Sequence, residues 1–157
     1  MADELLVTND ELLVTNDETL VLLEVAEQGP RGAQGPAGLS GGAALAAIAG
    51  EALGGHRAVV LDAAGQAFYA DRLTPSHFGR LAGITTGAAV LGASVTLAMS
   101  GVVIEPSWSW APNAPVFLGS TGLLTQALPI GGFLQVVGMA LNATTLFVNP
   151  REPLATL

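Results

Sequence analysis

Glycine recurs at every third position from Gly29 to Gly41, in the sequence GPRGAQGPAGLSG. Only glycine fits at the crowded axis of a collagen triple helix, and proline favours the extended left-handed chain that forms it. The run therefore predicts a short collagen-like stalk whose axial residues are Gly29, Gly32, Gly35, Gly38 and Gly41. A flexible Gly/Pro linker is the alternative interpretation of the same residues.

The predicted stalk is too short to hold three chains together by itself. Four triplets span only about 40 Å, at roughly 3.1 Å per residue. The flanking regions must then bring the three chains together. We therefore expect the part of the chain that follows the stalk to form a homotrimer.

Charge divides the chain at the start of the triplets. Residues 1–28 carry eight acidic residues and no basic ones, whereas residues 29–157 carry five of each sign. Nucleic-acid binding needs a basic surface, so no nucleic-acid partner is expected. The four predicted regions are an acidic repetitive anchoring arm (1–28), the stalk (29–41), a connector (42–55) and a β-rich trimerising head (56–157).

The acidic arm contains a tandem repeat. ELLVTND occurs twice without change, at 4–10 and 11–17, and 18–24 is a third, degenerate copy, ETLVLLE. The seven-residue spacing would suit a helix with one apolar face. Asn-Asp, however, favours turns and helix caps, so an extended peptide is the alternative. Residues 19–26 resemble a strand. A docking peptide gains avidity from such repetition, whereas recent duplication without function is the alternative. The predicted anchoring residues are Leu5, Leu6, Val7, Leu12, Leu13, Val14, Leu20 and Leu22.

Residues 43–53 (AALAAIAGEAL) predict a short helix or a plain connector. On a helix, Leu45, Ile48 and Ala52 would share one face and could pack about a trimer axis. Gly54 and Gly55 would then end the helix.

From His56 onward the pattern predicts β-structure. The expected hairpins are 58–61 with 66–70 and 133–140 with 144–148, and further strands are expected at 80–85, 88–91, 94–98, 102–105, 116–118 and 123–127. Short strands separated by turns indicate a mostly β fold, with a small barrel or sandwich as the head. Residues 81–104 are uncharged for long enough to span a membrane, but Gly, Thr and Ser interrupt them. We interpret the segment as buried strands and expect no membrane partner.

The chain offers few groups for catalysis. His56 and His77 are separated and lack metal-ligand spacing, and there is no cysteine. The carboxylates of residues 29–157 include no close acid/base pair, and His77 is interpreted as a loop or interface residue. We therefore predict no catalytic residue, no metal, no cofactor and no enzymatic activity.

Trp108 and Trp110 are the only tryptophans. Residues two apart on a strand share a face, so the rings could form a stacking platform for a sugar. Filling the core or the trimer contact is the alternative role.

The order of these features resembles the appendage proteins of tailed bacteriophages. An apolar strand leads through VAEQGPRG into the triplets, and the C-terminal half carries SWSWAPNAPVFLGSTGLLTQALP and then GFLQVVGMALNATTLFVNP. The resemblance covers roughly residues 24–150 and implies a homotrimeric, non-enzymatic protein of the virion, assembled in the host cytoplasm. It also implies attachment through the N-terminus, with the C-terminal domain outward. The ELLVTND duplication is not part of the resemblance.

From these features we expect a trimeric phage fibre or appendage whose arm binds other virion proteins. A tail or baseplate fibre is favoured, with a head fibre or capsid decoration protein as the alternative. A host-glycan-binding module is a second hypothesis, and a membrane-active segment is a third.

Overall fold

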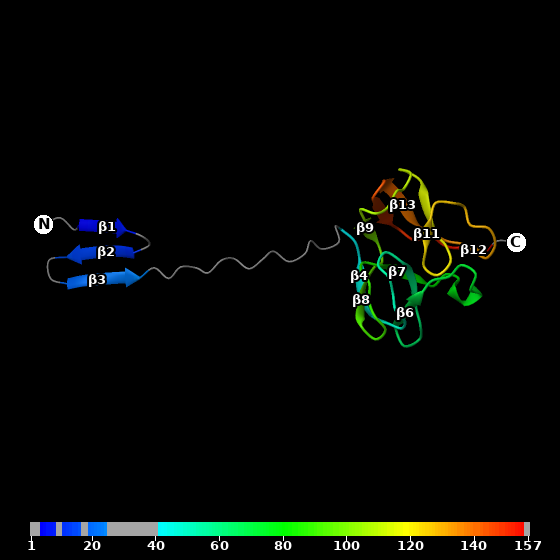
Figure 1. The fold of residues 1–157 in the computed structure, drawn as a ribbon, viewed down its shortest axis with the longest axis horizontal. Coiled ribbons are helices and arrows are strands. Elements are labelled where there is room, and N and C mark those ends of the chain that lie inside the picture. The colour runs from blue at the N-terminus through cyan, green and yellow to red at the C-terminus, as the bar shows by residue number, and fades with distance from the viewer. Residues whose placement is uncertain (1–3, 9–10, 17–18, 25–40, 156–157) are drawn as a thin grey trace. The chain divides into compact units, whose positions relative to one another are not determined.

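The computed structural model describes the backbone of residues 4–8, 11–16 and 19–24, and the backbone and side chains of residues 41–155. The chain divides into two compact units, Met1–Pro36 and Ala37–Leu157 (Figure 1). The side chains of the anchoring arm and four of the five stalk glycines lie outside the described part. Gly41, the fifth, has φ +68° and lies in a turn within the second unit.

In the first unit the repeats form three strands. These are β1 (Glu4–Thr8), β2 (Glu11–Asn16) and β3 (Thr19–Glu24). They pair antiparallel in the order β1-β2-β3, so that Leu13 of β2 lies opposite Leu6 on one side and Leu22 on the other. Each copy of the repeat thus supplies one strand, and β3 lies within the segment 19–26 that resembles a strand.

The second unit, the body, begins with a closed barrel. Its strands are β4 (Ala44–Ala49), β5 (Ala58–Leu61), β6 (Gln66–Tyr69), β7 (Leu81–Thr85) and β8 (Ser94–Ala98). They follow the order β4-β6-β5-β7-β8, and β8 returns to pair with β4. A short 3-10 helix, η1 (Pro75–His77), lies between β6 and β7.

A five-stranded sheet follows the barrel. It contains β9 (Gly101–Ile104), β10 (Pro115–Leu118), β11 (Leu124–Thr125), β13 (Val136–Asn142) and β14 (Thr145–Val148), in the order β11-β10-β13-β14-β9. Two short strands, β12 (Phe133–Leu134) and β15 (Leu154–Ala155), pair separately. Figure 1 shows the sheet beside the barrel in the body. The prediction of a mostly β fold with a small barrel or sandwich is therefore confirmed.

Alternation along β5 explains how the two layers join. Val59 points into the barrel, where it packs in a cluster with Leu53, Val95 and Leu97. Its neighbour Val60 belongs to the other cluster, which lies between the barrel and the sheet. Successive residues of a strand face opposite sides, so a strand buried on both sides is apolar throughout. The remaining members of the interlayer cluster include Ala58, Ile84, Ala98, Val103, Val116, Leu118, Val137, Leu146 and Val148.

The prediction of a helix or connector over residues 43–53 is wrong, because residues 44–49 form strand β4. Ala47 and Ala49 point into the barrel, whereas Ile48 is exposed, so the expected helical face does not exist. Small side chains fit the narrow interior, and five backbone pairs with β8 override the helix propensity of alanine. The β-rich region consequently starts before residue 56.

Other predicted strands are found with altered limits. Both predicted hairpins occur, as β5–β6 and β13–β14, and residues 81–104 form β7, β8 and β9. The strand predicted at 88–91 is wrong, since only Ala89 makes an isolated bridge, to Leu53. The strand at 133–140 is interrupted at Gln135, whose buried amide donates to the carbonyls of Val136 and Arg151.

The turn between β10 and β11 depends on Gly122. Its N–H donates to the Ala70 carbonyl at 2.6 Å, and its carbonyl accepts from the Ala58 N–H at 2.9 Å. Its φ is +72°, and a Cβ there would lie 2.6 Å from the Ala58 carbonyl oxygen. Only glycine can therefore attach this turn to the barrel.

We expect Gly122→Ala to lower the free energy of unfolding by about 2–4 kcal/mol, because left-handed backbone strain adds to the clash. Gly65→Ala is the matched control: its φ is +78°, but nothing lies within 4 Å of its Cβ position. It should cost only about 1–2 kcal/mol. Equal losses for both variants in urea unfolding would contradict this role of Gly122.

Candidate ligand-binding site around Trp108

A cavity of about 350 Å³ in the described body brings polar and aromatic side chains together. One side is the loop before β5, and the other is the segment that follows β9. The lining residues are Gly55, His56, Arg57, Glu105, Ser107, Trp108, Trp110, Leu123 and Leu124.

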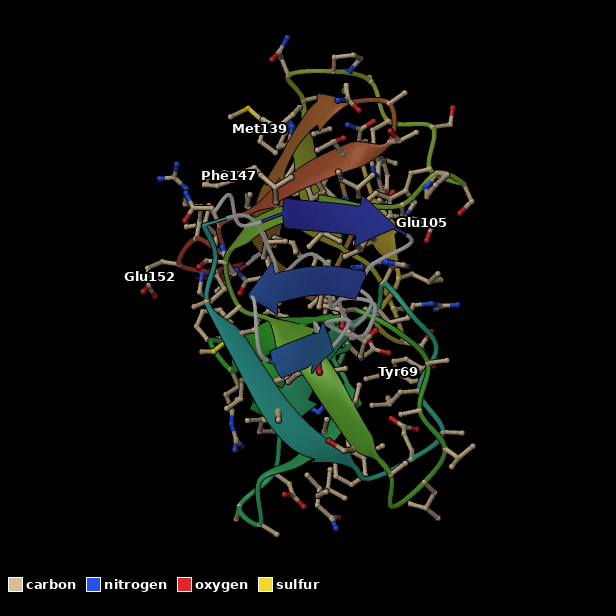
Figure 2. All side chains as sticks on the ribbon, turned by 90° about the vertical axis from the view of Figure 1, so that its left-hand side faces the viewer. Tyr69, Glu105, Met139, Phe147 and Glu152 are labelled. Carbon is tan, nitrogen blue, oxygen red and sulfur yellow. The ribbon has the colours of Figure 1, made fainter. Side chains whose placement is uncertain are left out.

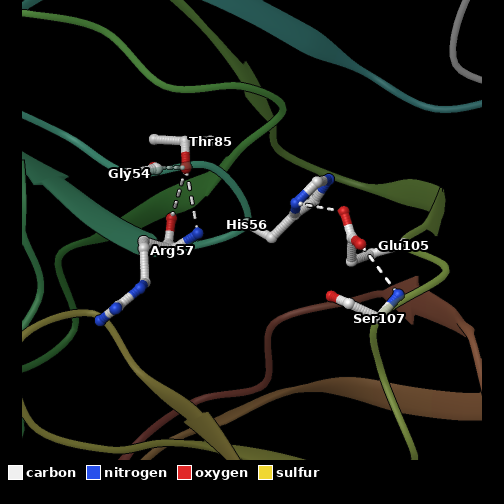
Figure 3. A network of polar contacts seen from close by, with 6 residues as sticks. All are labelled: Gly54, His56, Arg57, Thr85, Glu105 and Ser107. Atoms are coloured by element: carbon white, nitrogen blue, oxygen red, sulfur yellow. Dashed lines mark hydrogen bonds and ion pairs between the residues drawn. The ribbon is translucent and has the colours of Figure 1, made fainter.

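Buried Thr85 of β7 holds the loop before β5 (Figure 3). Its Oγ1 donates to the Gly54 carbonyl at 2.7 Å and accepts from the Arg57 N–H at 3.0 Å. The Thr85 carbonyl also accepts from the His56 N–H at 2.8 Å. These bonds hold His56 at φ +57°, a conformation uncommon for a residue with a side chain.

His56 forms an ion pair with Glu105 across the cavity. The distance from its Nδ1 to Glu105 Oε2 is 3.0 Å, and both side chains are about a quarter exposed. The Ser107 N–H donates to Glu105 Oε1 at 2.9 Å, so both carboxylate oxygens are engaged (Figure 3). The pair thus connects the barrel loop to the end of β9.

Hydrogen bonds from Ser107, first from its backbone N–H and then from its side chain, lower the pKa of Glu105 below its ordinary value of 4.5. Desolvation raises this pKa by less than the Ser107 bonds lower it, and the interaction with His56 makes the smallest contribution, which also lowers it. Glu105 is therefore a carboxylate near neutral pH.

The two tryptophans contact each other and the ion pair. Their ring centroids lie 5.5 Å apart at an interplanar angle of 53°, and Trp108 meets the His56 ring edge-on at 5.4 Å. Both rings are partly exposed and also pack against the interlayer cluster. The two rings are tilted and do not form a flat platform, and residues 108–110 are not in a strand.

The polar edge of Trp110 has no partner in the described body. Its Nε1–H is buried and donates to no acceptor among the described residues, which is uncommon for a buried polar group. The backbone around it is fixed: the Trp110 N–H donates to the Ala143 carbonyl at 2.9 Å. Gln126 pairs with both the N–H and the carbonyl of Ala111.

The groups that line this cavity are of the kinds that bind a small polyol. Aromatic faces pack against the C–H face of a sugar, and a fixed carboxylate accepts hydrogen bonds from its hydroxyls. Arg57 is held by the Thr121 carbonyl at 3.3 Å and lies 5.8 Å from the Tyr69 ring. The described residues contain no group of three His, Asp or Glu that could hold a metal ion.

Sequence reasoning identified the tryptophans but missed their polar partners. His56 and Glu105 are separated by 49 positions, and no local pattern indicates that they meet. His77 lies elsewhere, where its Nδ1 accepts from the Asp71 N–H at 3.0 Å. Its role there is to hold the loop after β6.

A second cavity, of about 460 Å³, is more apolar. Leu73, Phe78 and Phe133 line it, and the two phenylalanine rings meet edge-on at 5.5 Å. The Arg72 side chain at its rim donates to the carbonyls of Ile130 and Gly131. The Arg72 guanidinium is therefore already hydrogen-bonded to backbone carbonyls of the protein.

Large apolar side chains are also exposed over much of the body. They are Ile48, Leu73, Phe78, Val90, Leu91, Met99, Ile104, Leu123, Leu128, Ile130, Met139, Leu141, Phe147 and Leu154. No helix in the described part of the chain is both long and apolar enough to cross a membrane.

Comparisons of the chain with known protein families, with curated proteins and with solved structures found no match.

The lowered pKa of Glu105 predicts a pH effect on stability. A carboxylate whose pKa is lowered on folding stabilises the fold above its ordinary pKa of 4.5, and this stabilisation is lost as pH falls through the lowered value. The stability difference between wild type and Glu105→Gln should therefore be present at pH 6 and shrink in acid.

Thermal unfolding between pH 3 and pH 7 measures this difference, with Glu152→Gln at an exposed carboxylate as the control. A difference between wild type and Glu105→Gln that stays constant over this range would contradict the assignment.

Proposed function

We propose that this chain is a homotrimeric structural component of a bacteriophage particle, a fibre or appendage attached through its N-terminal arm. A tail or baseplate fibre is the first choice, and a head fibre or capsid decoration protein is the alternative. In this proposal the arm binds other virion proteins, the triplets form a short stalk, and the body projects from the particle.

The observation that carries the proposal is a small β body with many exposed large apolar side chains next to a Gly-X-Y run. Monomeric soluble proteins rarely expose large contiguous apolar patches, and such patches commonly mark interfaces. A Gly-X-Y run forms a collagen-like helix only where three chains run together. Both features therefore favour an assembly of identical subunits.

The tandem repeat supports attachment through the arm. Each copy contributes one strand of a three-stranded meander, and eight acidic residues lie within positions 1–28. Repetition presents the same backbone and sequence motif more than once, which raises the local concentration of a docking motif. An acidic arm of this kind suits a basic surface on another virion protein.

We expect the full chain to have the mass of three subunits at micromolar concentration. Light scattering coupled to size-exclusion chromatography measures this mass. Gly35→Ala should leave it unchanged, because the body and not the short stalk is expected to hold the chains together. A single-chain mass for the wild type would contradict the proposed function.

The cavity around Trp108 favours a second function, binding of a host surface glycan. Its two indole rings, a fixed carboxylate and an imidazole converge on one concave site of sugar size. Sites for small polar ligands are typically apolar concavities with a few well-placed polar groups. A fibre that touches the host surface would use such a site.

For this second function, Trp108→Ala should weaken glycan binding at least about tenfold, which corresponds to ~1.4 kcal/mol. Glu105→Gln should also weaken it, because the amide replaces one acceptor oxygen with a donor. Glycan-array binding is the measurement, and Ile130→Ala, at an exposed side chain outside the cavity, is the control. Unchanged binding in Trp108→Ala, with the same subunit mass as the wild type, would exclude this site.

A further inference from the structure

One face of the five-stranded sheet points away from the interlayer cluster. Its apolar residues, here called the outer apolar face, are Val102, Ile104, Met139, Leu141 and Phe147. Val103, Ala140, Leu146 and Val148 are buried inward, so alternation places their neighbours Val102, Ile104, Met139 and Phe147 outward. Leu141 is exposed at the irregularity in the pairing of β13 with β14. Figure 2 shows Met139 and Phe147 among the body's outward side chains.

Cross-strand pairing joins these residues into one surface. Phe147 of β14 lies opposite Met139 of β13 on one side and Val102 of β9 on the other. Side chains directly opposite one another in an antiparallel pair are in contact range. Phe147 is 37% exposed, Met139 46% and Ile104 63%.

An antiparallel sheet with one face in water normally places polar residues on that face. Here the row formed by Met139, Phe147 and Val102 is apolar across the three strands β13, β14 and β9, whereas the next outward row pairs Ile104 with Thr145 and Asn142. The apolar row therefore has the residue pattern of a surface that is covered. We infer that a second copy of this chain covers the outer apolar face, and that this contact holds the proposed trimer together.

The position where the stalk joins the body identifies the occupant as a second copy. Gly42 packs directly on the turn between β8 and β9, where an added Cβ would lie 2.0 Å from the Ser100 carbonyl oxygen and 2.9 Å from Gly101 Cα. The Ala43 N–H donates to Ser100 Oγ at 3.1 Å. Gly101 is followed by Val102, the first residue of the outer apolar face.

The triplets end at Gly41, immediately before this junction. Three chains in a triple helix are in mutual contact, because their glycines meet at one axis. Three bodies that follow such a stalk must begin side by side at Gly42. The surface next to Gly42 is then the one that meets the neighbouring copies, and the outer apolar face lies there.

Charge does not oppose this contact. The body, residues 37–157, carries five acidic and four basic residues, so three bodies have little net repulsion. None of the five residues of the outer apolar face is charged or polar. About a threefold axis each contact is heterologous, so one part of the outer apolar face would meet a different part of the neighbouring copy's surface.

The inference rests on the proposed function and is tested by the double variant Met139→Ser, Phe147→Ser in the full chain. We expect it to dissociate to single chains at concentrations where the wild type is a trimer, with subunit association weakened about hundredfold or more. The matched control is Val90→Ser, Leu91→Ser, two exposed apolar residues in the loop before β8, at the other end of that strand from Ser100. This control should remain a trimer, and far-UV circular dichroism should show that both double variants are folded.

The outcomes separate the inference from the function on which it rests. A trimeric wild type with a trimeric Met139→Ser, Phe147→Ser variant would overturn the inference and leave the trimer intact. A single-chain wild type would overturn the proposed function as well.

The absence of cysteine from the chain allows a second test. A maleimide should label Met139→Cys at least about tenfold more slowly than Ile130→Cys, whose parent side chain is 91% exposed. Equal labelling rates in the trimer would also overturn the inference.

Discussion

The apolar layer between the barrel and the five-stranded sheet determines the rest of the body. Val60 and Ile84 of the barrel meet Leu118, Leu146 and Val148 of the sheet in one buried cluster. Because the barrel uses its outer surface for this contact, strands such as β5 are buried on both sides. The same contact brings the loop before β5 next to the end of β9. The cavity around Trp108 is therefore a consequence of how the two layers pack.

Local patterns were sufficient to predict much of this fold. The β5–β6 hairpin follows from its turn, in which Asp62 Oδ1 accepts from the N–H groups of Ala64 and Gln66. Strand β8 matches its predicted limits, 94–98. The prediction of a helix or connector over residues 43–53 was wrong because alanine favours a helix in isolation, whereas pairing with β8 and the narrow barrel favour a strand. Long-range strand pairing of this kind produces no recognisable pattern in the local sequence.

The candidate site was also predictable only in part. Trp108 and Trp110 could be identified from their spacing, and the structure brings their rings together. The ion pair between His56 and Glu105 could not, because it depends on the packing of loops from two different layers. The outer apolar face could not be predicted from the sequence either, because an apolar strand does not show which of its faces is covered by its own chain. Only the strand register separates the inward residues from the outward ones.

The stalk, the outer apolar face and the cavity fit one arrangement. Three bodies held together beside the end of the triplets would leave other parts of each body free to project. The contacts between the bodies would then hold the stalk together, because the stalk is too short to hold three chains by itself. Under this account the acidic arm serves attachment, and the body serves assembly and any contact with the host.

Electron cryomicroscopy of whole phage particles that carry this chain, with a tag at its C-terminus, tests the central claim most directly. The account predicts a threefold projection with the N-terminal arm embedded in the particle and the tag at the outer end. Particles that lack the chain, or that carry it as single copies attached through the body, would contradict the account.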